Sequence, residues 1–267
     1  MSVKLIVAMC KNNGIGFNNK IPWKISEDMS YFFKKTSGNY LGDGDKKNVV
    51  IMGRNTWESL PKKYKPLPRR FNIVLTRNVQ RLLVLDQRDV AFSSSMDDAM
   101  NLCYGQGEKG EKGEKGENLS KKKSVSCNFN DIWIIGGSSV YQEFIKREMN
   151  TELSKYYITY IDKDYECDTY FPLLENMNKY HVTRFEKQMC IDNNTHNKTL
   201  LNVYYIVFKK IKYTDEKRIE ELFTSYKSSD EKKSNLILYV KNADIGKCDM
   251  SNMTADEHEI LFSMFCS

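Results

Sequence analysis

The chain has 267 residues and a mass of 31.2 kDa, with 40% apolar and 28% charged side chains. This composition is typical of a soluble globular protein and excludes disorder along the whole chain. No apolar run approaches the roughly 18 residues that cross a bilayer, which excludes an integral membrane protein. The amino-terminal apolar run stops at Lys11 without a small-residue cleavage site, so we expect no secretory signal and a cytoplasmic location.

The net charge of +6 is distributed unevenly along the chain. Residues 213–267 contain seven Lys or Arg and eleven Asp or Glu, so their net charge is −4 and that of residues 1–212 is +10. The basic part favours an anionic ligand, although nucleic acid and small phosphates respond to such a field alike. The seven cysteines include no Cys-x-x-Cys and the three histidines lack metal-ligand spacing, so we expect neither a disulfide framework nor a metal site.

Strand-like and helix-like segments alternate along residues 1–212, beginning with a continuous apolar run that is typical of a central strand. The alternation predicts an α/β fold with a mainly parallel sheet, helices on both faces and a single domain over residues 1–212. In chain order, the predicted elements are a strand at 3–10, a helix at 27–35 capped by Ser26, a strand at 48–52, a helix at 56–60, a strand at 71–76, a helix at 95–103, a strand at 132–135, a helix at 140–147, and strands at 156–161 and 202–209.

Two segments depart from this pattern. Residues 105–125 contain a Gly-Glu-Lys repeat and a lysine run, and we expect a flexible, solvated insertion because these residues offer little to bury. Residues 213–267 form an acidic extension with two predicted amphipathic helices, the first around residues 219–226. The second helix begins where Thr254 and Glu257 have capping-box spacing. We expect both helices to pack on the main domain rather than to bind a partner.

Two glycine motifs follow predicted strands. Gly14-Ile-Gly16 lacks the third glycine of a dinucleotide-binding fingerprint, so it indicates either a loop against a flat ligand or a plain turn. Gly136 and Gly137 stand between a buried strand and a helix start, where open amide groups and the helix dipole suit a phosphate. Tight packing explains these two glycines equally well.

Basic and hydroxyl side chains follow two further predicted strands. Arg54 and Thr56 come after one strand, and Thr76 and Arg77 come at the end of the next. Ligands of open α/β sheets bind at the carboxyl ends of the strands, and two arginines beside hydroxyls suit a phosphate monoester such as that on an adenosine ribose. Surface charge remains the alternative for either arginine taken singly.

Asp28 is the candidate acid. It lies on the first predicted helix, five residues after Trp23, with Met29, Phe32 and Phe33 nearby. Burial on this apolar face would raise the pKa of the carboxyl group. A solvent-facing acid is the more frequent case on a helix, and the neighbouring Glu27 is the alternative candidate.

Together, these motifs resemble the dihydrofolate reductase family, in order, over residues 3 to about 210. The resemblance implies a mixed, mainly parallel eight-stranded sheet with helices on both faces. It also implies NADPH-dependent reduction of 7,8-dihydrofolate to 5,6,7,8-tetrahydrofolate, which supplies one-carbon metabolism and thymidylate synthesis. The matching motifs are Ile6-Val-Ala8, Gly14-Ile-Gly16, Ile21-Pro-Trp23, Asp28, Met52-Gly-Arg-Asn-Thr-Trp57, Arg70, Thr76-Arg77, Ile135-Gly-Gly-Ser-Ser-Val-Tyr141 and Asp168-Thr169.

The resemblance also implies roles at the substrate. Asp28 would hold the 2-amino and N3 groups of the pterin and promote protonation at N5, with Trp23 as a second catalytic residue. Thr169 would support Asp28 directly or through water. Arg70 would bind the α-carboxylate of the substrate's glutamate as a two-pronged ion pair. The other implied substrate-binding residues are Ile6, Phe32, Leu67, Ile135 and Tyr141.

For the cofactor, the resemblance places Arg54, Thr76 and Arg77 at the 2′-phosphate, which favours NADPH over NADH. The pyrophosphate would be bound by Thr56 and by the amides of Gly137, Ser138 and Ser139, and the Gly136–Gly137 peptide bond would be cis. The remaining implied cofactor-binding residues are Ala8, Ile15, Gly16, Lys20, Asn55, Gly136 and Val140.

The insertion and the acidic extension depart from the family pattern. Some protist reductases are fused to thymidylate synthase, but the 55 residues after Lys212 are too few for that domain and contain no Pro-Cys-His motif. We therefore expect either a monofunctional enzyme, as a monomer, or a truncated fusion. Two alternatives remain: a riboflavin-pathway pyrimidine reductase, against which Asp28 and Arg70 argue, and a non-catalytic basic protein that binds nucleic acid, for which no binding motif is present.

Overall fold

The computed structural model describes residues 1–38, 46–78, 89–105, 129–147, 153–172, 180–194, 198–210 and 253–265. Within these ranges, no helix is long and apolar enough to cross a membrane. The predicted insertion, apart from its first residue, and the predicted helix at 219–226 lie outside the described residues. The domain boundary at residue 212 lies outside them too and stays a prediction.

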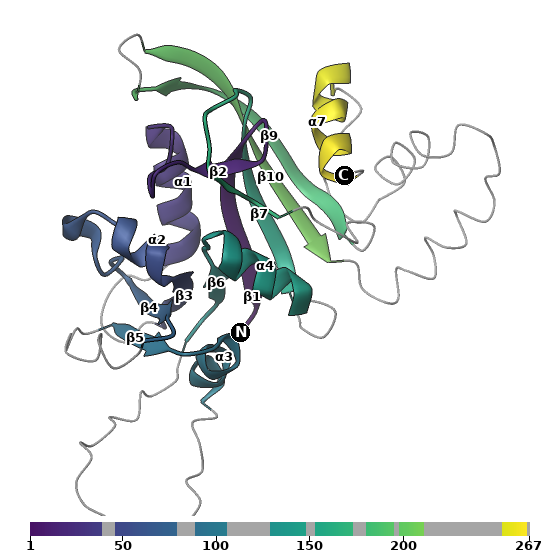
Figure 1. Cartoon of the computed structure of the whole chain (residues 1–267). Coiled ribbons are helices and arrows are strands. Elements are labelled where there is room, and N and C mark those ends of the chain that lie inside the picture. The colour runs from purple at the N-terminus through teal and green to yellow at the C-terminus, as the bar shows by residue number, and fades with distance from the viewer. Residues whose placement is uncertain are drawn as a thin grey trace, which may run out of the picture.

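The alternating segments form an eight-stranded sheet with the order β5-β4-β3-β6-β1-β7-β10-β9 (Figure 1). Neighbouring strands are parallel except around β10, which is antiparallel to both β7 and β9. The sheet is thus mixed and mainly parallel, as expected, with the first strand near its centre. The strands are β1 (Val3–Cys10), β3 (Asn48–Gly53), β4 (Arg70–Leu75), β5 (Val90–Ser93), β6 (Ile132–Ile134), β7 (Leu153–Ile161), β9 (Tyr180–Asp192) and β10 (Thr199–Lys210).

Helices cover both faces of the sheet because side chains alternate along the buried strands. On β1, Leu5 belongs to a core cluster with α3 (Met96–Tyr104) and α4 (Ser138–Arg147). The next residue, Ile6, belongs to a cluster on the opposite face with α1 (Ser26–Ser37) and α2 (Arg54–Ser59). A short 3-10 helix, η1 (Lys62–Tyr64), follows α2.

The second predicted helix of the extension is present as α7 (Ala255–Phe265), which lies beside β9 and β10 (Figure 1). Its capping box is confirmed, because the Thr254 amide donates to Glu257 Oε2 (3.0 Å) and the Glu257 amide donates to Thr254 Oγ1 (3.3 Å). Ile260 and Leu261 are buried in the same cluster as α3 and α4. The expectation that this helix packs on the main domain is therefore confirmed.

Several local predictions are wrong. Ser26 does not cap α1: the extended residue before it is Ile25, no side chain caps the helix, and Ser26 Oγ donates to Glu27 Oε2 instead. The short second helix begins at Arg54, two residues earlier than predicted, because the extended Gly53 ends β3 directly before it. Strands β5 and β9 were not predicted, and the middle of β9 is a run of exposed residues with no apolar alternation.

A separate two-stranded sheet was not predicted either. It pairs β2 (Gly14–Gly16) with β8 (Thr169–Tyr170) in antiparallel orientation. Strands of two and three residues carry too few side chains to show a periodic pattern. This small sheet brings the first glycine motif next to the Asp168-Thr169 motif.

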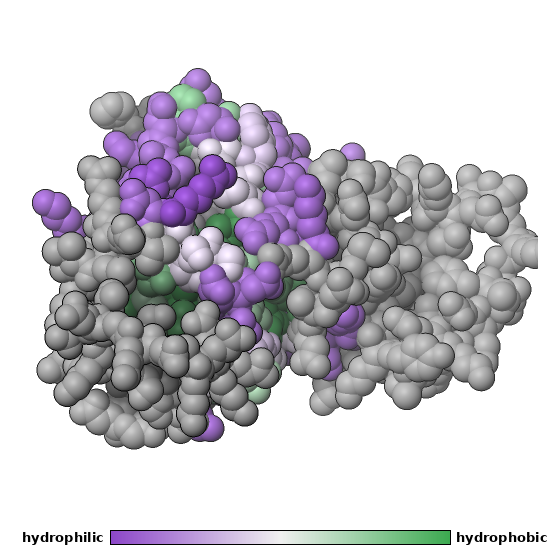
Figure 2. All heavy atoms as spheres, turned by 60° about the horizontal axis from the view of Figure 1, so that its bottom comes forward, coloured by the Kyte–Doolittle hydropathy of each residue, from purple (hydrophilic) through white to green (hydrophobic). Residues whose placement is uncertain are grey.

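Figure 2 views the end of the molecule at which the amino terminus and α3 lie. Hydrophilic residues form most of the described surface in this view, and hydrophobic residues show mainly in recesses between them (Figure 2). This distribution agrees with the three buried apolar clusters between the sheet and its helices.

Candidate active site

A cleft of about 2040 Å³ opens on the sheet, bordered by α1, α2, the β2 segment and the start of α4. Its position follows from the topology, since the carboxyl ends of β1, β3 and β4 lie at one edge of the sheet. Every site residue predicted above except Gly136 lines it. These residues are Ile6, Ala8, Ile15, Gly16, Lys20, Trp23, Asp28, Phe32, Arg54, Asn55, Thr56, Leu67, Arg70, Thr76, Arg77, Ile135, Gly137, Ser138, Ser139, Val140, Tyr141 and Thr169.

Asp28 is the buried acid of this cleft. Its side chain is 6% exposed, and burial raises the pKa of the carboxyl group from 3.8 to about 6. The neighbouring Thr159 and Trp23 side chains favour the ionised form and moderate this rise. Glu27, the alternative candidate, is half-buried and does not line the cleft. The geometry therefore favours Asp28 as the acid that a ligand would meet.

The threonine beside Asp28 is not the predicted one. Thr169 lines the cleft, but its hydroxyl donates to Asp168 Oδ1 (2.8 Å). Thr159, on β7, is the threonine that moderates the pKa of Asp28, and the direct contact predicted for Thr169 is absent; support of Asp28 by Thr169 through water stays a prediction. The sequence marks Thr159 only as a polar residue within a predicted buried strand, and the pairing of that strand with β1 is known from the structure.

Arg70 is the buried cation of the cleft, at 2% exposure, and burial lowers its pKa to about 10. Its Nη1 donates to Thr36 Oγ1 (2.6 Å), and its Nε donates to the Pro68 carbonyl oxygen (3.0 Å). The guanidinium carbon lies 5.6 Å from the ring centroid of Phe32. Among the described residues, no carboxylate lies within ion-pair distance of Arg70, so the site can accept an anion from a ligand.

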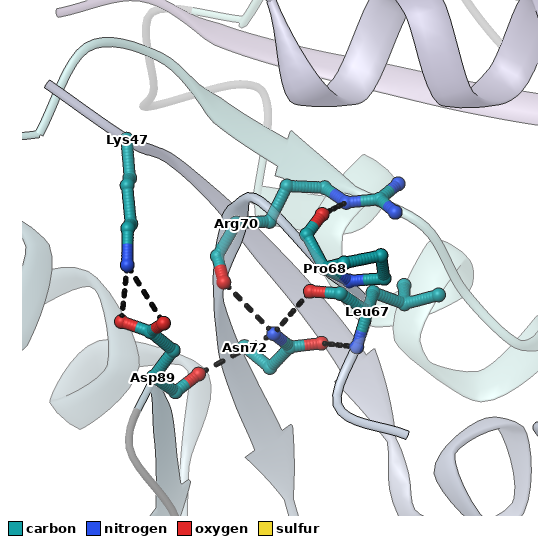
Figure 3. A network of polar contacts seen from close by, with 6 residues as sticks. All are labelled: Lys47, Leu67, Pro68, Arg70, Asn72 and Asp89. Carbon is teal, nitrogen blue, oxygen red and sulfur yellow. Dashed lines mark hydrogen bonds and ion pairs between the residues drawn. The ribbon is translucent and has the colours of Figure 1, made fainter. Parts of the chain in front are cut away.

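A polar network holds the segment before Arg70 in place (Figure 3). The Asn72 side chain accepts from the Leu67 amide (3.0 Å) and donates to the carbonyl oxygens of Leu67 (3.1 Å) and Arg70 (3.0 Å). The Asn72 amide donates to the Asp89 carbonyl (2.8 Å), and Lys47 holds the Asp89 carboxylate at 2.7 Å. Sequence reasoning missed Asn72, since an asparagine within a strand gives no hint of which loop it holds.

The start of α4 offers backbone donors to the cleft. The amides of Gly137, Ser138 and Ser139 make no backbone hydrogen bond among the described residues, as is usual in the first turn of a helix. The Gly136–Gly137 peptide bond is cis, as the resemblance implies, and Gly136 has a φ of +96°. A Cβ atom at Gly136 would lie 2.6 Å from the Tyr141 ring, so only glycine fits there.

Tyr141 connects α4 to β1. Its hydroxyl donates to the Ile6 carbonyl oxygen at 2.7 Å, and its ring makes an edge contact with Phe171. Burial raises the pKa of Tyr141 far above its usual range, so the hydroxyl stays protonated. The Ile6 carbonyl, which the resemblance places near the pterin, thus already accepts one hydrogen bond from within the protein.

Arg54, Thr76 and Arg77 lie at the ends of two adjacent parallel strands, where Gly53 pairs with Leu75. Arg54 forms an exposed ion pair with Glu58 one helical turn away (3.2 Å). The Thr76 hydroxyl accepts from the Asn78 amide (3.3 Å). The topology thus brings these basic and hydroxyl groups to one edge of the cleft.

Comparison with known proteins agrees with this geometry. The family profile described as "Dihydrofolate reductase" matches residues 2–206. The chain belongs to the dihydrofolate reductase family. A relative named dihydrofolate reductase from Heliothis virescens is 31% identical over 211 residues, covering 79% of this chain and 98% of the relative. The dihydrofolate reductase of Mus musculus is 37% identical over 179 residues, covering 66% and 81% of the two chains.

Some relatives within the dihydrofolate reductase family are larger. The protein named bifunctional dihydrofolate reductase-thymidylate synthase 2 from Arabidopsis thaliana is 31% identical over 172 residues, covering 64% of this chain and 26% of the relative. The family match ends at residue 206, before the last residues of β10, so α7 lies outside it. The mixed eight-stranded sheet that the family resemblance implies is confirmed.

Proposed function

We propose that the chain reduces 7,8-dihydrofolate to 5,6,7,8-tetrahydrofolate with NADPH, supplying one-carbon metabolism and thymidylate synthesis. The observation that carries the proposal is a buried acid, Asp28, and a buried cation without a carboxylate partner, Arg70, on one cleft of a chain that belongs to the dihydrofolate reductase family. Dihydrofolate has a pterin with hydrogen-bond donors at one end and a carboxylate at the other. The two buried groups complement these two ends.

Asp28 orients the pterin in this proposal. Its carboxylate accepts hydrogen bonds from the 2-amino and N3 groups, and the neighbouring Thr159 and Trp23 side chains favour its ionised form. A general acid is most effective when its pKa lies near the working pH, and the pKa of Asp28, about 6, is close to neutral pH. It promotes protonation at N5, while Phe32, Leu67 and Ile135 pack on the substrate.

Arg70 binds the α-carboxylate of the substrate's glutamate. Its Nε and Nη1 atoms are held by Pro68 and Thr36, so the guanidinium is oriented before the ligand arrives. A buried guanidinium has little water to give up, which strengthens a two-pronged ion pair with a carboxylate. Lysine at this position would offer neither the fork nor the fixed orientation.

The residues along the α2 and α4 side of the cleft fit NADPH. Open amides at the start of α4 and the Thr56 hydroxyl suit the pyrophosphate, and Arg54, Thr76 and Arg77 suit a 2′-phosphate. When bound, NADPH supplies the hydride that the pterin C6 accepts. Tyr141 and the β2 segment, with Ile15 and Gly16, border the nicotinamide end and exclude water from it. The remaining residues proposed at the cofactor are Ala8, Lys20, Asn55, Gly136 and Val140.

We further propose that the enzyme acts in the cytoplasm without a membrane or nucleic acid, as a monomer unless it is part of a thymidylate synthase fusion. Bifunctional proteins occur among its relatives in Arabidopsis thaliana and Daucus carota.

The test is NADPH oxidation by the purified full-length chain, measured with and without dihydrofolate. We expect NADPH oxidation to depend on dihydrofolate. The Asp28→Asn variant should lose this activity, and the Glu27→Gln variant should retain it. If the folded chain oxidises NADPH equally fast without dihydrofolate, or reduces a pyrimidine-ribose substrate instead, the proposed function is wrong.

A further inference from the structure

Two cysteines lie side by side next to the β2 segment that borders the cleft. Cys10 is the last residue of β1, and Cys167 lies two residues before β8. Their Sγ atoms are 3.8 Å apart, and both are free thiols. Cys10 is fully buried, whereas Cys167 is partly exposed to solvent.

The two sulfur atoms have to move closer before they can form a bond. A disulfide has an S–S length of about 2.05 Å, so the Sγ atoms need to close by about 1.8 Å. Gly14 packs directly on Cys167, since a Cβ atom there would lie 2.3 Å from its Sγ. The absence of a side chain at Gly14 is what allows Cys167 to face Cys10.

The Asn12 side chain hydrogen-bonds the Cys10 thiol and the segments on either side of the cysteine pair. Cys10 Sγ donates to Asn12 Oδ1 (2.8 Å), and the Gly14 amide donates to the same oxygen (3.2 Å). Asn12 Nδ2 donates to the carbonyl oxygen of Tyr165 (3.3 Å), two residues before Cys167. The two segments that carry the thiols are therefore already held together in the reduced protein.

We propose that Cys10 and Cys167 are a modification site, a dithiol that forms a reversible disulfide and fastens β2 and β8 to the end of β1. The oxidant is a small disulfide such as oxidised glutathione. The more exposed Cys167 loses its proton to solvent and attacks one sulfur of the oxidant, whose other sulfur leaves as a thiolate.

Cys10 then completes the bond. Its thiolate attacks Sγ of Cys167 in the mixed disulfide, and the second glutathione leaves as a thiolate. Two protein thiols are oxidised, one glutathione disulfide is reduced to two thiols, and the two protons end on the leaving thiolates. Burial raises the pKa of Cys167 to about 11, so little of it is thiolate at neutral pH and its attack on the oxidant is slow.

The disulfide would restrain a segment that borders the cleft. Gly16 pairs with Thr169, the Asp168 amide donates to the Gly16 carbonyl oxygen (3.0 Å), and the Asn18 amide donates to Asp168 Oδ2 (2.8 Å). These bonds join the β2 segment to β8, and Asn12 joins the β2 segment to Cys10 through hydrogen bonds alone. A covalent link at Cys167 would tie this unit to the central strand of the sheet.

The experiment equilibrates the full-length chain with glutathione buffers of increasing oxidised fraction, then alkylates free thiols and maps them by mass spectrometry. We expect the loss of two alkylated thiols together, at Cys10 and Cys167, with a peptide pair joined by a disulfide. Amide hydrogen exchange over residues 11–18 should slow by about tenfold on oxidation and recover on reduction.

Variants separate this site from other cysteines. In the Cys167→Ser variant, which changes the more exposed of the two positions, Cys10 should remain a free thiol that is alkylated in every glutathione buffer. The Cys103→Ser variant, changed in the core of α3, should oxidise like the wild type. The proposal is overturned if Cys167 ends as a stable mixed disulfide with Cys10 still alkylated. It is also overturned if the bond forms without slowing exchange over residues 11–18. Neither readout uses turnover, so the proposed function can fail without affecting this result.

Discussion

Replacing Asp28 with Asn should make the protein more stable and less active. The pKa of Asp28 is about 6 in the folded chain against an ordinary value of 3.8, because burial penalises the charged form. Between these two values the folded state binds the proton and the unfolded state does not, so the free energy of unfolding falls as the pH rises from about 4 to about 6. At about 1.36 kcal/mol per pKa unit, the difference between 3.8 and about 6 costs the fold about 3 kcal/mol above pH 6.

Asp28→Asn keeps the shape of the side chain and removes the ionisation. At pH 8 its free energy of unfolding should exceed that of the wild type by up to about 3 kcal/mol, reduced by any favourable interaction with Thr159 and Trp23 that the substitution removes. At pH 4 the difference should shrink towards zero, since the carboxyl is then protonated in the folded wild type. Urea unfolding at several pH values between 4 and 8 measures this difference directly.

The same variant tests the catalytic role. Turnover of dihydrofolate at neutral pH should drop by about 10²- to 10⁴-fold if general acid catalysis makes its usual contribution. Lowering the pH should partly restore the rate, because substrate that is already protonated at N5 needs only the hydride. NADPH binding should persist.

Glu27→Gln is the matched control, one residue away and outside the lining of the cleft. It should change neither the pH dependence of stability nor turnover. A stability gain in Asp28→Asn that is the same at pH 4 and pH 8 would refute the argument from the buried charge. Near-normal turnover of Asp28→Asn, with loss in Glu27→Gln, would refute the choice of acid.

Three further predictions concern other parts of the chain. Replacing Arg54 and Arg77 together by Gln should raise the KM for NADPH far more than that for NADH, and equal changes would contradict a 2′-phosphate site. Thr159→Val removes a hydroxyl group that favours ionised Asp28, so the pH-rate profile should shift to higher pH; an unchanged profile would show that the hydroxyl does not matter. Deleting residues 106–123 should leave turnover and the midpoint of thermal unfolding nearly unchanged, and a folded but inactive deletion would show that the segment takes part in the site.

The strands that the sequence predicted best are those with continuous apolar runs. The predicted strand at 3–10 matches β1 at both ends, because both its faces are buried and every residue contributes to the signal. β9 could not be found in this way. Four consecutive residues in its middle are exposed, and it is defined by its hydrogen bonds to β10 rather than by side-chain pattern.

Within the candidate site, single-element features were easier to predict than contacts between elements. Asp28 stood out because its helix is apolar around it, and the structure buries it in the cleft. Thr159 was missed and Thr169 chosen instead, although both lie near the cleft. The choice between them depends on how β7 lies beside β1, which places Thr159 next to Ala8, and no local pattern carries that register.

The fixed and desolvated guanidinium of Arg70 bears on inhibitor design. The fold carries the energetic penalty of this charge whenever the cleft holds no anion near it. If the proposed function holds, a compound that ends in a carboxylate removes the penalty on binding, whereas a neutral compound leaves it in place and has to gain its affinity at the Asp28 end of the cleft. Substitutions near Asp28 should therefore lower the affinity of neutral inhibitors proportionally more than that of acidic ones. A single substitution at this end of the cleft should then cause resistance to neutral inhibitors more readily than to acidic ones.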